Sequence, residues 1–145
     1  MRRRAITVIA LAAALLAVSV ASAAAPKQRT PVQVVRAWSK ALNASDDKTA
    51  GSLFAPGALA IQGGFVVRLN TAKSAVLWNS GLPCSGTLVR FRVRRNVVTA
   101  TFVLGRRKGH RCDAPGQLAA AKFTIVKGKI TRWEQVAPDT TGLVA

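Results

Sequence analysis

The chain has 145 residues, with 22 lysine and arginine residues against 5 acidic ones and a formal charge of +17. This length suits a single domain with one core. Its two cysteines and single histidine lack the closely spaced ligands of a zinc site, and we expect neither a metal nor a cofactor. The basic excess indicates an anionic partner or, alternatively, a surface that only keeps the protein soluble.

Residues 1–25 are typical of a secretory signal peptide. Three arginines after Met1 precede an apolar run over 5–20, and small residues at 21–25 form cleavage patterns. A retained membrane anchor is the alternative, because a bilayer is spanned by about 20 apolar residues. Cleavage would leave a secreted or cell-envelope protein without a membrane span, with 19 lysine and arginine residues and a formal charge of +14.

The first elements after the leader are helical. After a short linker at 26–30, the pattern predicts a helix that begins at Pro31, a residue suited to the first turn, and ends at Asn43. Its apolar stripe consists of Val32, Val35, Trp38 and Leu42. A short second helix follows, with Ser45 as its N-cap and its end near Phe54.

Glycine-marked turns and alternating apolar residues predict the remaining elements. A short hairpin is expected at 58–62 and 65–69, and a third helix is capped by Asn70 or Thr71 and ends at Gly81. Longer strands are then expected at 86–94, 97–104, 118–126 and 129–136. The loop at 105–116 is basic and carries His110 and Cys112; we expect it to be solvated.

The two cysteines, Cys84 and Cys112, are expected to form a disulfide, because export leads to an oxidising compartment. A turn at 95–96 would set Arg92 opposite Thr99 and Leu88 near Val103, which brings Cys84 close to the loop that holds Cys112. Metal binding is the alternative use of the pair.

The order of elements, the run F-A-P-G-A at 54–58 and the opening of the last strand at 128–133 resemble the nuclear transport factor 2-like (SnoaL-like) superfamily. The resemblance covers 31–136, so the domain is placed at 31–137 and a tail at 138–145. It implies an α+β fold in which three N-terminal helices pack on a curved antiparallel sheet and enclose one pocket. Members include hydrolases, isomerases, dehydratases, cyclases and domains with no known chemistry, so the fold does not determine the function.

The superfamily's known active sites do not map onto this chain. The absence of tyrosine removes the oxyanion hole that ketosteroid-isomerase relatives use. The Asp-Arg-Asp set of epoxide-hydrolase relatives has no counterpart here, and His110 is too isolated for the histidine-rich site of dehydratase relatives.

One acidic residue on a predicted strand, Glu134, is a candidate general base beside Arg132 as an anion-binding group. Ile130 and Val136 share their face and indicate that this face looks into the pocket. A structural ion pair or a solvated strand face is the alternative. Pocket-lining candidates, which would otherwise belong to the core, are Trp38, Phe54, Trp78 and Phe123.

The strand at 86–94 places Arg90, Arg92 and Arg94 on one face, where they are candidates for binding an anionic polymer. We expect Lys122 and Trp133 on this outer face too. A homodimer through the face is the alternative, although three like charges make a dry interface costly. Nucleic acid is not expected, because the face lacks repeated stacking aromatics.

Together these observations favour a secreted basic domain that binds a small ligand or an anionic envelope component. The alternatives are a small-molecule enzyme of hydrolase, isomerase or cyclase type that uses Glu134 and Arg132, and a structural envelope protein.

Overall fold

The computed structural model describes residues 27–141, so the predicted signal peptide and residues 142–145 of the tail lie outside the described part. The elements in chain order are α1 Pro31–Asn43, α2 Asp47–Ser52, β1 Phe54–Gln62, β2 Phe65–Leu69, α3 Ala72–Ser80, β3 Ser85–Arg94, β4 Val97–Gly105, β5 Leu118–Val126 and β6 Lys129–Val136. Within these residues, no helix is long and apolar enough to cross a bilayer.

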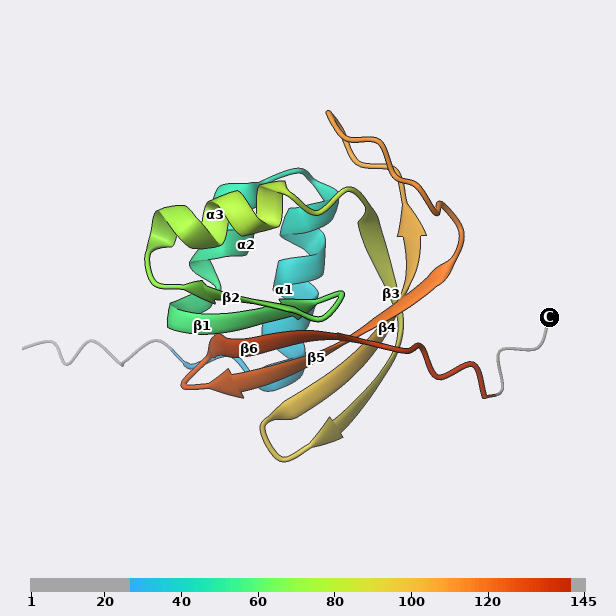
Figure 1. The fold of residues 1–145 in the computed structure, drawn as a ribbon. Coiled ribbons are helices and arrows are strands. Elements are labelled where there is room, and N and C mark those ends of the chain that lie inside the picture. The colour runs from blue at the N-terminus through green and yellow to red at the C-terminus, as the bar shows by residue number, and fades with distance from the viewer. Residues whose placement is uncertain (1–26, 142–145) are drawn as a thin grey trace, which may run out of the picture.

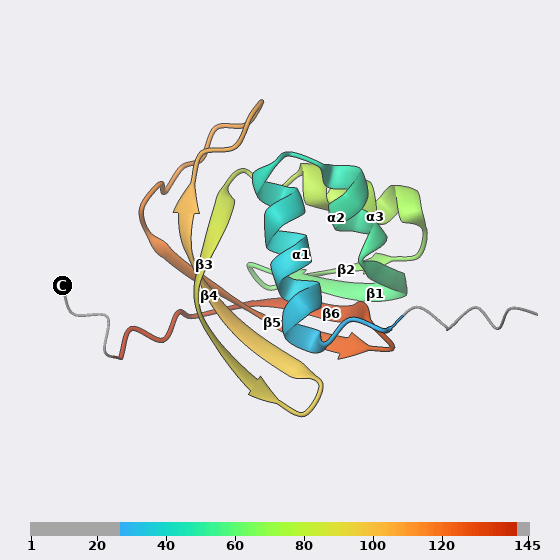
Figure 2. The same cartoon turned by 180° about the vertical axis from the view of Figure 1, so that it is seen from behind.

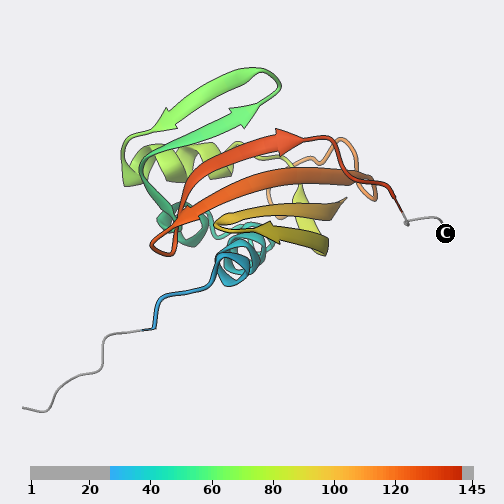
Figure 3. The same ribbon diagram turned by 90° about the horizontal axis from the view of Figure 1, so that it is seen from below.

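The strands form one curved sheet in the order β2-β1-β6-β5-β4-β3. The helices lie on one face of this sheet (Figures 1 and 3). This arrangement confirms the expected α+β fold of helices on a curved sheet. The pairing of β1 with β6 is parallel, whereas the other pairings are antiparallel, so the sheet is mixed.

The first helix begins where the sequence predicts. Thr30 is its N-cap: the Thr30 hydroxyl accepts from the Gln33 backbone N–H, and the Gln33 side chain accepts from the Thr30 N–H at 2.8 Å. Pro31 occupies the first turn, where its missing N–H costs no hydrogen bond. The apolar stripe of the helix is buried at Val34, Val35, Trp38 and Leu42, and α1 packs across β3, β4 and β5 (Figure 2).

The second helix and the first strand differ from the sequence prediction. Ser45 adopts a positive φ of 54° and is not a cap; the N-cap is Asp46, whose carboxylate accepts from the Thr49 N–H at 3.0 Å. Helix α2 already ends at Ser52, and Phe54 opens strand β1. The early start reflects pairing of Phe54 with Ile130 in β6, a partner distant in sequence that local pattern cannot reveal.

The last residue of α1 attaches the helix to the edge of the sheet. The Asn43 side-chain carbonyl accepts from the Gly86 N–H at 2.7 Å, and its amide donates to the Gly86 carbonyl at 3.1 Å. The Ser39 hydroxyl donates to the same carbonyl at 2.7 Å. These bonds satisfy backbone groups on edge strand β3 that face away from β4, and they fix α1 against the sheet.

Candidate ligand-binding cavity

A cavity of about 240 Å³ lies between α1 and the concave face of the sheet. Its apolar lining includes Trp38 and Leu42 from α1, Phe102 and Leu104 from β4, Trp133 from β6 and the alanines 119–121 of β5. Its polar lining includes Gln62, Ser85, Asp113 and Gln135. An apolar cavity with a few polar groups is the usual form of a small-molecule site.

The space exists because β5 carries alanines where it passes beneath α1. Ala121 is buried and pairs with Ala100 on one side and Gln135 on the other. Alanine leaves room above the sheet that the larger side chains elsewhere on β5, such as Phe123, fill. Phe123 is fully buried and stacks edge-on against Trp38, with 5.2 Å between ring centroids.

Two tryptophans, Trp38 and Trp133, contribute to the cavity wall, and their indole N–H groups differ in hydrogen bonding. Trp38 donates from Nε1 to the Asn79 side-chain carbonyl at 2.8 Å, which fixes its ring. Trp133 is packed against Trp78 with 4.8 Å between ring centroids. The Nε1 of Trp133 is buried and has no hydrogen-bond partner within residues 27–141.

One side of the cavity is formed by the loop between β4 and β5, which the disulfide holds in place. Cys84 and Cys112 are bonded, with 4.6 Å between their Cα atoms, as predicted. Cys84 itself lines the cavity, and so do Asp113 and Ala114 from the loop. The crosslink therefore sets the position of part of the cavity wall.

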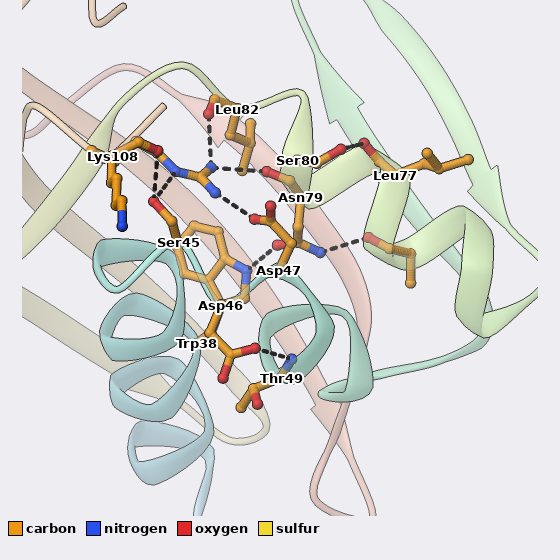
Figure 4. A network of polar contacts seen from close by, with 12 residues as sticks. Trp38, Ser45, Asp46, Asp47, Thr49, Leu77, Asn79, Ser80, Leu82 and Lys108 are labelled. Atoms are coloured by element: carbon orange, nitrogen blue, oxygen red, sulfur yellow. Dashed lines mark hydrogen bonds and ion pairs between the residues drawn. The ribbon is translucent and has the colours of Figure 1, made fainter. Parts of the chain in front are cut away.

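The prediction that this loop is solvated is wrong for Arg107, whose side chain is fully buried. Its guanidinium donates to the backbone carbonyls of Asn79 at 3.0 Å and Leu82 at 2.8 Å, and it forms an ion pair with Asp47. Figure 4 shows Trp38, Ser45, Asp47, Asn79 and Leu82 converging in this network. The network joins the loop to α2 and to the end of α3, and through Asn79 it reaches Trp38.

Arg132 and Glu134 do not line this cavity, contrary to the sequence prediction. The ladder pairs Ile130 with Ile125 but Arg132 with Thr124, so an extra residue, Thr131, forms a bulge. The bulge reverses the alternation of side chains along β6. Ile130 and Trp133 are therefore both buried, whereas Arg132 and Glu134 share the opposite face, where they form a partly exposed ion pair at 3.2 Å.

The same bulge overturns the expected outer position of Trp133. Of the four aromatic candidates for the pocket, Trp38 lines the cavity. The other three, Phe54, Trp78 and Phe123, lie in the aromatic packing next to it.

The arginine stripe lies on the outer face of the sheet, and Arg92 pairs with Thr99 as predicted. A bulge at Val89 shifts the earlier register, so Leu88 lies opposite Phe102 instead of Val103. Asp139, beyond β6, forms ion pairs with Arg92 at 2.8 Å and Arg90 at 4.0 Å. Hydrogen bonds from the Thr141 side chain and then its backbone lower the pKa of Asp139 below its ordinary value of 3.8.

Comparison with protein-family models finds no match, and no curated protein matches the sequence. Solved structures share the architecture. A nuclear transport factor 2-like protein of unknown function from Cytophaga hutchinsonii superposes with a TM-score of 0.64 at 13% identity; the match covers 82% of this chain and 98% of that chain. This chain has the nuclear transport factor 2-like fold.

Two other structures with this fold have more specific descriptions. A protein with a ketosteroid isomerase-like fold from Catenulispora acidiphila, solved with trimethylamine, matches at 19% identity and a TM-score of 0.59, over 75% of this chain and 87% of that chain. A protein described as a polyketide cyclase from Sinorhizobium meliloti matches at 18% identity and a TM-score of 0.58, over 71% and 93%. These identities establish a shared fold and no shared activity.

Sequence reasoning missed several lining residues of this nuclear transport factor 2-like domain. Gln62 and Gln135 lie on strands that are not adjacent in the chain, and only the sheet order brings them to one cavity. The alanine run at 119–121 was the available signal, because three small residues inside a buried strand indicate space or close packing.

Proposed function

We propose that the protein is an exported domain that binds a small, largely apolar ligand in the cavity. The observation that carries this proposal is an apolar cavity walled by Trp38, Phe102 and Trp133 within a nuclear transport factor 2-like fold. Aromatic walls offer a ligand large contact areas at little loss of side-chain freedom.

The charges around the cavity favour binding over catalysis. Among the described residues that line it, Asp113 is the one with an acidic or basic side chain, and it is exposed in the loop. General acid–base catalysis needs a titratable group within hydrogen-bonding reach of the reacting atoms. The pair of Arg132 and Glu134 lies away from this lining, which supports a structural use of that pair.

The binding proposal is tested by filling the cavity. The substitution Ala121→Leu places a larger side chain in the space above β5, and Ala44→Leu, at an exposed position after α1, is the matched control. Affinity for tetralin, a bicyclic hydrocarbon, is measured by calorimetry on folded protein. We expect at least about tenfold weaker binding in Ala121→Leu and no change in Ala44→Leu. Equal affinity in both variants would overturn the proposal.

Export is the second part of the proposal. The Cys84–Cys112 disulfide supports it, because such bonds persist in oxidising compartments. N-terminal sequencing of exported protein should show cleavage between about residues 23 and 25. Recovery of Met1 from a membrane fraction would contradict cleavage.

A further inference from the structure

The hairpin of β1 and β2 presents large apolar side chains to solvent at its tip. Phe65 is 78% exposed, Val66 62% and Val67 45%. They follow directly on a turn whose two residues, Gly63 and Gly64, have positive φ values of 57° and 83°, which glycine adopts without steric cost. The turn is therefore tight, and it holds these three side chains, which we call the apolar tip, at one edge of the sheet (Figure 3).

The apolar tip is uncovered on both faces of its strand. Strand β2 pairs with β1 on one side and ends the sheet on the other. Consecutive residues of a strand point to opposite faces, and all three residues of the tip are exposed, so within residues 27–141 neither face of the strand is covered here. Scattered single apolar residues are normal on a protein surface, whereas a contiguous group indicates an interaction surface.

The surroundings of the tip are basic. Residues 54–80, which form β1, β2 and α3, include exposed Arg68 and Lys73 and no aspartate or glutamate. The acid on the neighbouring strand β6, Glu134, is paired with Arg132. Apolar side chains beside basic ones match the surface of an anionic bilayer, because the apolar groups enter the acyl region and the basic groups stay at the charged headgroups.

A second copy of the chain is the other partner that an edge strand can take, because two such strands can pair. Residues 27–141 hold 19 lysine and arginine residues against 5 acidic ones, so two copies carry the same high positive charge. Arg68 lies within the strand that would pair. Like charges oppose this association, whereas anionic lipid attracts them. The charge therefore favours a membrane as the partner.

We infer that the apolar tip docks the protein onto membranes that contain anionic lipids, with Phe65, Val66 and Val67 inserted at the bilayer interface. The inference goes beyond the proposed cavity ligand and does not depend on it. Gln62, which pairs with Phe65, lines the cavity, so docking brings one rim of the cavity to the lipid surface.

The test measures co-sedimentation of purified exported protein with vesicles of phosphatidylcholine, with and without phosphatidylglycerol. The tip variant carries Phe65→Ser and Val67→Ser. The matched control carries Phe91→Ser and Val93→Ser, at positions 39% and 45% exposed on the opposite edge strand β3. The wild type and the control should bind the anionic vesicles alike. The tip variant should bind at least about tenfold more weakly, because two apolar side chains no longer leave water.

Both variants keep the net charge, so both should bind polyphosphate as the wild type does. Loss of polyphosphate binding in the tip variant would overturn the assignment to apolar insertion. A measurement on the wild type covers the case in which a variant fails to fold: spin-labelled lipid in anionic vesicles should broaden the amide NMR signals of residues 63–67 more than those of β3.

Absence of wild-type binding to anionic vesicles would overturn the inference, and so would equal binding of the wild type and the tip variant, or equal broadening along β2 and β3. A wild-type dimer that the tip substitutions dissociate, with vesicle binding unchanged, would overturn it in favour of a second copy of the chain.

Discussion

Arg107 connects the loop between β4 and β5 to α2 and to the end of α3. Its buried guanidinium donates to the carbonyl of Asn79 near the end of α3, to that of Leu82 just after α3, and to the Asp47 carboxylate at the start of α2. Replacing it by Gln would leave these groups without a cationic donor. Removing one partner of a buried pair costs about 3 kcal/mol or more.

We therefore expect Arg107→Gln to lower the free energy of unfolding by about 3 kcal/mol, measured by urea denaturation. The control is Arg106→Gln, at the exposed neighbouring position, where a change within about 0.5 kcal/mol is expected. Similar losses in the two variants would show that the network does not stabilise the fold.

Asp139 provides a pH-dependent contact between the C-terminal segment and the sheet. Its pKa is lowered in the folded protein, chiefly by hydrogen bonds from Thr141. The stabilisation is therefore fully present above the ordinary value of 3.8 and is lost as the pH falls through the lower folded pKa. In an NMR titration the side-chain resonances of Arg90 and Arg92 should shift only below this ordinary value, and Asp139→Asn should already show the shifted resonances at neutral pH.

At the scale of single residues, the sequence predicted a covalent pairing and a helix cap, but it did not predict which charged side chain is buried. The pairing of the two cysteines was predicted, and the cap of α3 was narrowed to Asn70 or Thr71, of which the structure uses Thr71 through local hydrogen bonds. The burial of Arg107 was not predicted, because its acceptors lie on segments far away in the chain.

Asn43 acts at the scale of elements, as a link between α1 and the edge strand β3. Its side chain makes two hydrogen bonds to Gly86 that replace those of a neighbouring strand. The substitution Asn43→Ala leaves the Gly86 N–H without this acceptor, and we expect a loss of about 1–3 kcal/mol in the free energy of unfolding.

The matched control for this link is Lys40→Ala, at an exposed position on the same helix. It should leave the stability nearly unchanged, because alanine favours a helix at least as well as lysine. Hydrogen exchange at the Gly86 amide should accelerate in Asn43→Ala alone. Protection equal to that of the wild type would contradict the link.

The elements themselves were largely predictable, and their irregularities were not. Strands β2, β5 and β6 begin and end where alternation and glycine turns placed them. The bulge at Thr131 depends on the pairing of β6 with β5, which local sequence does not encode. Because of this one extra residue, Trp133 lies on the cavity side of β6, where Glu134 was expected, and Glu134 lies on the opposite face. The predicted site at Glu134 and Arg132 is therefore not at the cavity.

The outer face of the whole molecule presents arginines whose charge is partly neutralised by Asp139. If this face binds anionic polymers, Asp139→Asn should strengthen binding to polyphosphate, and replacing Arg90, Arg92 and Arg94 together by Gln should weaken it. Both effects should decline with added salt, because exposed charges are screened over about 8 Å at physiological ionic strength.

A variant with the same change in net charge at other positions distinguishes binding by this arginine face from attraction by the overall charge of the protein. Lys40, Lys48 and Lys73 are exposed on the helices, and their joint replacement by Gln should weaken binding far less. Equal weakening in the two triple variants would mean that the overall charge alone attracts the polymer. A change in mass by light scattering in the arginine variant would instead indicate that the face joins two subunits.

The parallel pairing of β1 with β6 has a consequence for the order in which the protein can fold. Strand β6 is the last strand in the chain but lies in the interior of the sheet, between β1 and β5. Until β6 emerges from the ribosome, the hairpin of β1 and β2 has no neighbouring strand, and long-range pairing of this kind forms slowly. The sheet therefore cannot close until the last strand of the chain is available.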